Sequence, residues 1–222
     1  MIWHAKSYST IFQTLSTPQE IAEIFEWADH NELLQEKAKM INEVYQNGNE
    51  LEIKVASVFL ESALFYSGFY TPLLFLGNGK MVNSAEIIKL ILKDESVHGN
   101  YIGIKYRDLF NQLSEQEQAE QHEWVLDFLL ELYQLEVKYT EELYGEIGWV
   151  EDVLQFVRYN FNKALQNLGF DSVFPDGVIE NINPLVANGI STETSNHDFF
   201  SQVGNGYLIG ESESMSDDDY DF

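Results

Sequence analysis

Apolar and polar positions follow one another along most of the chain with the spacing of amphipathic helices. In the stretches 16–30, 82–110 and 113–144, apolar residues recur every three or four positions, with charged residues between them. This spacing gathers the apolar side chains on one face of a helix, so each stretch predicts a helix that packs on a core. The stretch 51–70, LEIKVASVFLESALFYSGFY, is apolar nearly all round and predicts a long, largely buried helix.

Three of these helices begin with residues that cap helix N-termini. Thr17 precedes Pro18, a residue favoured in the first helical turn, and Glu20 follows three positions after the cap. A cap residue with a glutamate three positions later can form a capping box, in which each side chain binds the other's backbone N–H. The other pairs of this kind are Asn83 with Glu86 and Ser114 with Glu117.

Glycines predict where the helices bend or end. The segment YSG at 66–68 predicts a local irregularity in the buried helix, because glycine in a helix interior needs a reason. GNGK at 77–80 predicts a turn. The stretch 151–169 predicts a last helix that stops at Gly169.

These elements predict an all-α protein with three regions along the chain. No stretch shows the alternation of a β-strand, and residues 1–170 predict a bundle of long antiparallel helices. Residues 171–200 contain two of the four prolines and lack a helical period, so we expect an irregular extension. Residues 201–222 predict a flexible tail, with six acids and no base from Glu211 onward. The terminal DYDF adds aromatic residues, which suit a short peptide that becomes ordered on a partner.

Composition and charge narrow the function classes. A chain of 222 residues with 45% apolar residues can bury a substantial core. The formal charge of −25 argues against nucleic acid or an anionic membrane as a partner, although acidic helix faces are usually only solvated surface. The absence of cysteine fits a reducing cytoplasm. We find no signal peptide and no uncharged stretch of the roughly 20 residues that a membrane helix needs.

Two of the predicted helices carry candidate metal ligands. Glu61 lies among apolar residues, where an unpaired carboxylate would be costly to bury, so we expect it to be paired, protonated or metal-bound. Glu95 and His98 lie one helical turn apart. Di-metal carboxylate bundles use a lone acid from each of two helices and Glu-x-x-His from each of the other two, and iron or manganese prefers such oxygen and nitrogen ligands.

A second Glu-x-x-His pair is only half present. His4 and Tyr8 share one helix face, and a glutamate paired with His4 would stand at position 1, where the chain has Met1. A single Glu-x-x-His also arises by chance, and an isolated histidine such as His98 is often structural. The spacing alone therefore leaves a metal site and an ordinary bundle both open.

Longer motifs resemble one family throughout the chain from His4 to Phe222. These motifs resemble the small, radical-bearing subunit of class Ib ribonucleotide reductase, whose fold is a ferritin-like helical bundle. The motifs are HAKSYS, FLESALFYSGFY, KDESVHGNYIGIKY, ELYQLEVKYTEELY, VRYNFNKALQNLGF and NHDFF.

The resemblance implies roles for the candidate ligands and for one tyrosine. His4 matches the histidine of the first Glu-x-x-His pair, and Tyr8 matches the tyrosine that is oxidised to a stable radical. Glu61 matches a lone carboxylate, and Glu95 with His98 matches the second pair. The implied cofactors are two manganese or two iron ions and the tyrosyl radical. The radical would start reduction of a ribonucleoside diphosphate on the large subunit.

Further residues match positions around this centre. Asp94 matches an aspartate that hydrogen-bonds the first histidine and joins the electron-transfer route. Such an outer partner fixes the tautomer and orientation of an imidazole. Phe65, Phe69 and Ile91 are expected to enclose the tyrosine in an apolar pocket.

The C-terminal residues match positions that serve a partner. Tyr207 resembles the tail tyrosine that relays the radical to the large subunit. The terminal Tyr220, Asp221 and Phe222 resemble the peptide that docks on that subunit, with Tyr220 where tryptophan is commoner. The family also implies a homodimer and a small flavodoxin-like activator that supplies the oxidant when manganese is used.

The resemblance also predicts a missing part. The family pattern extends some 90 to 100 residues upstream of His4 and there supplies an aspartate ligand, the first glutamate and a tryptophan of the radical route. Methionine is a poor ligand for hard iron or manganese ions, so Met1 cannot replace that glutamate. We therefore expect the C-terminal piece of a split coding region, completed by splicing or by a separate N-terminal polypeptide, and inactive alone.

Three other interpretations stay open at this point. The chain could be a non-catalytic module that only binds the large subunit through its tail. It could be a different di-metal bundle, such as an oxidase, that has replaced the missing ligands. It could also be an acidic helical bundle with no site.

Overall fold

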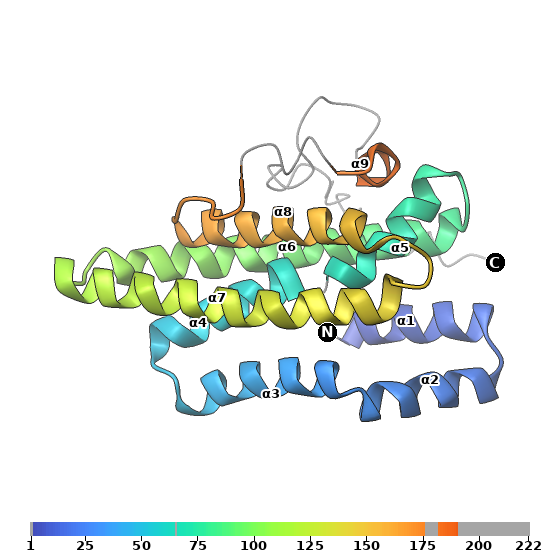
Figure 1. Ribbon diagram of the computed structural model, residues 1–222, viewed down its shortest axis with the longest axis horizontal. Coiled ribbons are helices and arrows are strands. Elements are labelled where there is room, and N and C mark those ends of the chain that lie inside the picture. Colours follow the sequence, from blue (N-terminus) through green and yellow to red (C-terminus); the bar gives the residue numbers. More distant parts are fainter. Residues whose placement is uncertain (1, 65, 176–181, 191–222) are drawn as a thin grey trace, which may run out of the picture.

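In the computed structural model, residues 2–64, 66–175 and 182–190 are described, and helices make up nearly all of them (Figure 1). No strand occurs among these residues, which agrees with the predicted all-α class. The elements are α1 (Ile2–Leu15), α2 (Pro18–His30), α3 (Glu32–Asn47), α4 (Glu50–Phe59), the π-helical turn η1 (Leu60–Leu64), α5 (Tyr66–Gly77), α6 (Val82–Phe110), α7 (Glu115–Tyr144), α8 (Val150–Leu168) and α9 (Pro184–Ile190).

The capping signals give the correct helix start in two of three cases. Thr17 and Ser114 form complete capping boxes with Glu20 and Glu117. The prediction for Asn83 is wrong, because α6 already begins at Val82 and its N-cap is Met81. Met81 has a left-handed backbone, with φ 48°, and makes no side-chain cap bond. The turn before α6, not a local cap, therefore sets its start.

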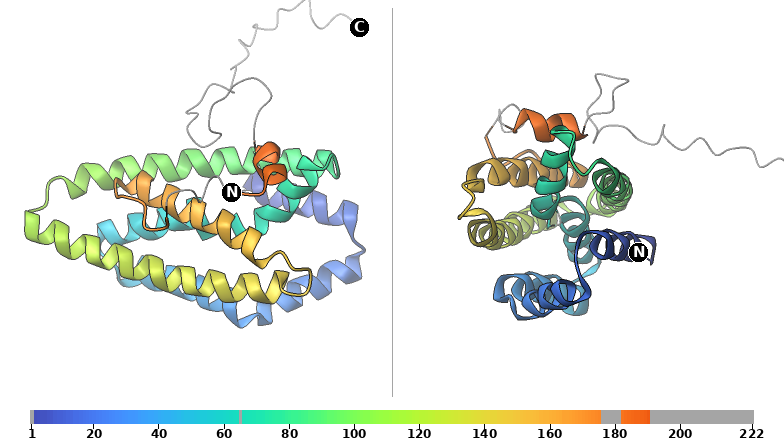
Figure 2. Two further views of the ribbon diagram at one scale, coloured as in Figure 1. Left: turned by 45° about the horizontal axis from the view of Figure 1, so that its top comes forward. Right: turned by 90° about the vertical axis from the view of Figure 1, so that its right-hand side faces the viewer.

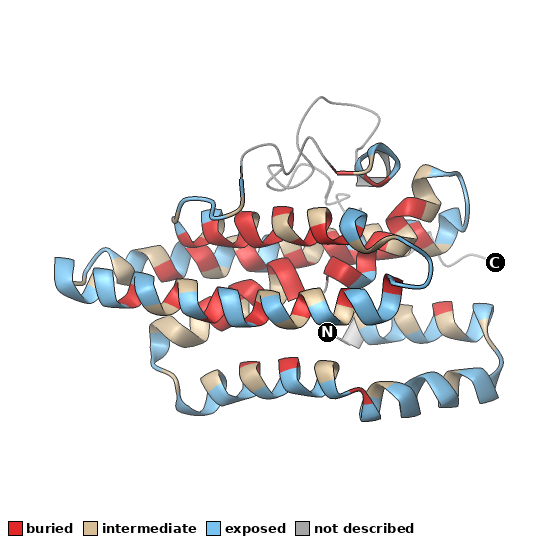
Figure 3. Cartoon of the chain, in the orientation of Figure 1, coloured by how far each residue is buried: buried red, intermediate tan, exposed pale blue. Residues whose placement is uncertain are grey.

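The core lies where α4, η1, α5, α6 and α8 meet. Buried residues concentrate on these elements and on the inner face of α7, as Figure 3 shows. In contrast, α2 and α3 lie outside the rest of the bundle, at the bottom of Figure 1 and of the right-hand view of Figure 2, and α1 contacts α2 and α6. α2 has no buried residue, and α3 joins the bundle through contacts with α4 and α7. Glu61, on η1, therefore stands at the centre of the bundle.

The irregularity of the buried helix lies one turn earlier than predicted. The chain adopts a π-helical turn at Leu60–Leu64, and Glu61 stands within it. Gly68 lies in the regular helix α5, where a side chain would meet nothing within 4 Å. Single π turns inside α-helices are frequent at functional sites. The prediction of a break at 66–68 was therefore wrong in position.

The C-terminal part differs from the prediction in one element. Helix α8 ends at Leu168 and Gly169 takes a φ of 91°, as expected for a glycine that stops a helix. After it, Pro184–Ile190 forms the short helix α9, which packs on α5, so the region 171–200 is not irregular throughout. The stretch Glu50–Gly77 is apolar and long enough to cross a membrane, but 59% of its most apolar window is buried inside the bundle, as in an ordinary core helix.

Close approach of α6 and α8 gives a first prediction. A Cβ on Gly103 would lie 2.3 Å from the backbone oxygen of Asn167, which cannot move without shifting α8. We expect Gly103→Ala to lower the free energy of unfolding in urea by about 1–3 kcal/mol, the usual cost of overpacking. Gly68→Ala is the matched control, because open space there leaves only the gain in helix propensity, about 1 kcal/mol. Equal effects of the two variants would contradict the prediction.

Candidate metal centre

Glu61, Glu95 and His98 form one compact cluster. η1 supplies Glu61, and α6 supplies Glu95 and His98 one turn apart. One ligand atom of each lies within 4.8 Å of the others. His98 Nδ1 is 3.3 Å from Glu61 Oε2 and 3.1 Å from Glu95 Oε2. The fold thus brings together Glu61 and Glu95, which lie 34 positions apart in the chain.

His4 joins the cluster from α1. Its Nδ1 lies 3.1 Å from Glu95 Oε1, and its Nε2 lies 3.1 Å from Asp94 Oδ2. Glu95 therefore faces both histidines, one with each carboxylate oxygen. Asp94 contacts the ring nitrogen of His4 that points away from Glu95. An outer carboxylate in this position can hold one tautomer of a ligating imidazole.

The cluster concentrates negative charge in a partly buried place. Burial raises the pKa of Glu61 to about 7, and both the hydrogen bond with Glu95 and the negative charge of Glu95 add to this effect. Burial acts to lower the pKa of His98, but the hydrogen bond to Glu95 and the charge of Glu61 outweigh it, so the pKa is raised. The proximity of Glu61 and Glu95 contributes to both shifts, after burial in the case of Glu61.

This donor set fits a hard divalent cation. Carboxylate oxygens with imidazole nitrogens are ligands that manganese and iron accept. Burial and the charge of Glu95 both disfavour the ionised form of Glu61, and a bound cation would offset both by pairing with the carboxylates. The electrostatics of the cluster therefore fit a divalent cation. On the described residues, His4, Glu61, Glu95 and His98 are the side chains available to hold such ions.

Tyr8 lies beside the cluster on the wall of a shared cavity. The cavity has a volume of about 570 Å³. Burial, with the charge of Glu95, raises the pKa of Tyr8 to about 12, so its hydroxyl is protonated at neutral pH. Phe69 and Ile91, two of the residues expected around Tyr8, line the same cavity. The full lining is His4, Ala5, Tyr8, Leu60, Glu61, Phe69, Ile91, Glu95 and His98.

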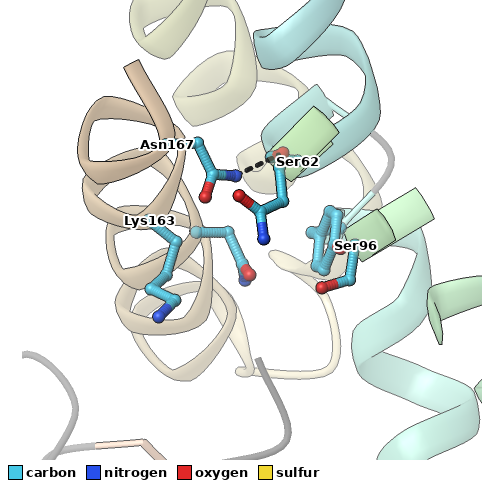
Figure 4. Close-up of a pocket in the computed structure, with 7 residues that line it drawn as sticks. Ser62, Ser96, Lys163 and Asn167 are labelled. Atoms are coloured by element: carbon cyan, nitrogen blue, oxygen red, sulfur yellow. Dashed lines mark hydrogen bonds between the residues drawn. The ribbon is translucent and has the colours of Figure 1, made fainter. Parts of the chain in front are cut away.

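A second, polar pocket was missed from the sequence. Ser62 and Ser96 each follow a cluster acid in the chain, and α8 contributes Lys163 and Asn167 (Figure 4). Asn167 Nδ2 donates to Ser62 Oγ over 3.3 Å. The space measures about 20 Å³, enough for one water molecule. The one sequence signal for this pocket is that Ser62 and Ser96 each directly follow a glutamate of the cluster. The remaining lining residues are Tyr66, Asn100 and Asn160.

Several predicted positions lie outside the described residues. These are Phe65 in the expected tyrosine pocket, Tyr207 in the expected radical route, and the expected docking residues Tyr220, Asp221 and Phe222. Their predicted roles stay predictions.

Comparison with known proteins identifies relatives over nearly the whole chain. The family model for the small chain of ribonucleotide reductase matches residues 2–184. The ribonucleoside-diphosphate reductase subunit beta of Bacillus subtilis is 50% identical over 225 residues, which cover 99% of this chain and 68% of that protein. Ribonucleoside-diphosphate reductase 2 subunit beta of Escherichia coli is 44% identical over 220 residues, 99% of this chain and 69% of that protein.

A solved structure resembles the fold as well. The dimanganese(II)-NrdF of Streptococcus sanguinis matches with a TM-score of 0.82 and 59% identity, over 85% of this chain and 66% of that chain. The chain thus spans about two-thirds of the length of the relatives that it matches.

Proposed function

This chain belongs to the family of ribonucleotide reductase small chains, and we propose that it carries the tyrosyl radical of a ribonucleoside-diphosphate reductase on Tyr8. The observation that supports this most directly is the shared cavity. Tyr8 and the four potential ligands line one space, so an oxidising event at the ligands would occur next to the phenol. The reduction of the ribonucleoside diphosphate would take place on a separate large subunit.

The ligands proposed for two manganese or two iron ions are His4, Glu61, Glu95 and His98. When bound and treated with an oxidant, such ions supply the oxidising power that takes one electron from Tyr8. Asp94 would hold His4 in one tautomer through their 3.1 Å contact.

The surroundings of Tyr8 would preserve its radical. The phenol keeps its proton until the electron leaves, because its pKa lies well above neutral pH. Phe69 and Ile91 present only hydrocarbon to the cavity and would limit the contact of water and reductants with the ring on their side. An apolar surround of this kind slows the return of an electron and a proton.

We assign partners from the same premise. The large subunit would bind the acidic tail through Tyr220, Asp221 and Phe222 and receive the radical by way of Tyr207. A flavodoxin-like protein would supply the oxidant when manganese is used. Its small polar oxidant would find hydrogen-bonding groups in the pocket of Figure 4, where Ser62 and Ser96 are the chain neighbours of Glu61 and Glu95. A homodimer and a cytoplasmic location complete this proposal.

The metal centre would need further ligands from outside the described residues. Four side chains are few for two ions, since the di-metal carboxylate bundles use six. His98 is also 51% exposed at the side chain, which leaves one side of the cluster open. A cleft lined by residues of α3 and by Leu64 meets the tyrosine cavity at Leu60. An additional helix in this cleft, from the same or another polypeptide, could bring the remaining carboxylates.

A reconstitution experiment tests the proposed function. The chain is mixed with a polypeptide comprising the third of the Bacillus subtilis subunit that it does not match, and then with Mn²⁺ or Fe²⁺ and an oxidant. We expect a tyrosyl radical signal in electron paramagnetic resonance from the mixture, and none from the chain alone or from Tyr8→Phe. Adding the Bacillus subtilis large subunit should then give deoxyribonucleotide.

Two results would contradict this proposal. A radical of the same intensity in Tyr8→Phe would place the radical on another residue. Binding of the large subunit without metal, radical or product in any mixture would favour a module that only docks through its tail.

A further inference from the structure

Aromatic side chains that the proposed function does not use form a continuous row through the core. Tyr66 and Tyr70 lie one turn apart on α5, and both contact Phe156 of α8. The row begins at Phe69, on the wall of the Tyr8 cavity, and ends at Trp149, the residue before α8. Successive ring centroids are 5.5 Å apart for Phe69–Tyr66, 6.1 Å for Tyr66–Phe156, 6.2 Å for Phe156–Tyr70 and 6.3 Å for Tyr70–Trp149.

The two ends of the row lie in different environments. Tyr66 is almost fully buried, and the charges of Glu95 and Glu61 act on its hydroxyl, which places it next to the metal cluster. Trp149 lies in the connection between α7 and α8, where it packs against the core and is only partly buried. The row thus links the cluster to solvent through the interior of the protein.

Packing alone does not account for the hydroxyl of Tyr70. The ring is fully buried, and its hydroxyl makes no hydrogen bond of ordinary geometry, although Asp152 and Asn183 lie close enough to act on its pKa as hydrogen-bonding neighbours. Phenylalanine would fill the same ring position without a hydroxyl. The hydroxyl makes the ring far easier to oxidise than phenylalanine. Asp152 lies near enough for its charge to contribute to the raised pKa of Tyr70, about 12, behind the effect of burial.

We propose that Trp149, Tyr70 and Tyr66 form a one-electron relay between the protein surface and the Tyr8 cavity. Electrons hop readily between tyrosine and tryptophan side chains that are separated by a single ring. The route leaves the cavity at Phe69, on α5, whereas Asp94 contacts His4 from α6. The relay would let a reductant at the surface return oxidised Tyr8 to the phenol. This role rests on the proposed function.

Electrons and protons balance along this route. The Tyr8 phenoxyl radical gains one electron from the relay and one proton from the open side of its cavity. Tyr66 releases its hydroxyl proton into the polar pocket that it lines while it is oxidised, and recovers it when Tyr70 reduces it. Tyr70 transfers its hydroxyl proton to Asp152 while it is oxidised and recovers it when Trp149 reduces it. Trp149 loses the electron and gives its indole proton to solvent. A one-electron donor in solution, such as a thiol, then reduces the Trp149 radical.

Pulse radiolysis of the metal-free full chain tests the relay. Azide radicals, which oxidise tryptophan, create the indolyl radical, and its absorption is followed together with that of tyrosyl radicals. We expect a first-order conversion of tryptophan radical to tyrosine radical whose rate does not depend on protein concentration. Trp149→Phe should lose this phase, and Tyr70→Phe should prolong the tryptophan radical. The Tyr70→Phe variant should fold normally, since it keeps the buried ring and removes a hydroxyl that makes no hydrogen bond of ordinary geometry.

Control variants make each outcome decisive. Trp27→Phe alters an exposed tryptophan of α2 and should leave the phase unchanged. A phase that survives Trp149→Phe at the same rate would overturn the proposal. A phase lost in Trp149→Phe but unaffected in Tyr70→Phe would also overturn it, because the electron would not come from the interior. No metal is needed, so the result is independent of the reconstitution experiment.

Discussion

Replacing Glu95 by alanine should abolish tight binding of Mn²⁺ by the reconstituted centre. Glu95 faces His4 with one oxygen and His98 with the other, each over 3.1 Å. The substitution therefore removes a proposed ligand and also the carboxylate that contacts both histidines. We expect the affinity to fall by more than the roughly 10–100-fold that loss of an outer hydrogen-bond partner costs. Titration with Mn²⁺, followed by the resonance signal of the free ion, measures the affinity.

Two other substitutions in α6 provide comparisons for the loss of Mn²⁺ affinity in Glu95→Ala. Asp94→Asn keeps every proposed ligand and changes only the partner of His4, so we expect a loss of about 10–100-fold. Glu86→Gln removes an exposed acid near the start of α6 and should change the affinity little. If Glu95→Ala binds Mn²⁺ as Glu86→Gln does, the cluster is not the metal centre. The three variants separate a ligand, a positioning residue and the general charge of the helix.

Local signals were read correctly from the sequence where local contacts decide the structure. The capping boxes at Thr17 and Ser114 formed, because each needs only residues three positions apart. Asn83 failed as a cap because Met81 adopts a left-handed backbone and α6 starts before it. Likewise, no residue pattern in the sequence marks the π-helical turn at Leu60–Leu64. In both places the tertiary path of the chain, and not the local helix propensity of its residues, determines the backbone conformation.

The same distinction holds for the candidate site. Glu95 and His98 could be paired from their spacing, and an acid as isolated as Glu61 among apolar residues required a partner. The polar pocket could not be found in this way, because Lys163 and Asn167 come from α8, about 100 residues from Ser62. Residues this far apart form no recognisable motif in the sequence, and only the fold brings them together.

The buried pair of Lys37 and Glu136 is another contact of this kind, and it predicts a large loss of stability. Lys37 Nζ lies 2.6 Å from Glu136 Oε1, and the Glu136 side chain is fully buried. Lys37→Met would leave that carboxylate without its cation, and its other oxygen already has no hydrogen bond with the described residues. Breaking one side of a buried ion pair costs about 3–5 kcal/mol, which we expect as the loss in free energy of unfolding in urea.

A double replacement distinguishes the lost charge from lost packing. Lys37→Met together with Glu136→Leu should recover most of the stability, because an apolar pair of similar volume is often as stable as the ions it replaces. Lys39→Met, an exposed lysine of the same helix, should cost at most about 1 kcal/mol. A double variant as unstable as Lys37→Met alone would mean that the lysine stem, not its charge, holds α3 to α7. Residues of α3 line the cleft that meets the tyrosine cavity at Leu60. Loss of the Lys37–Glu136 contact between α3 and α7 would therefore also loosen this cleft, which is the proposed docking site of the additional helix.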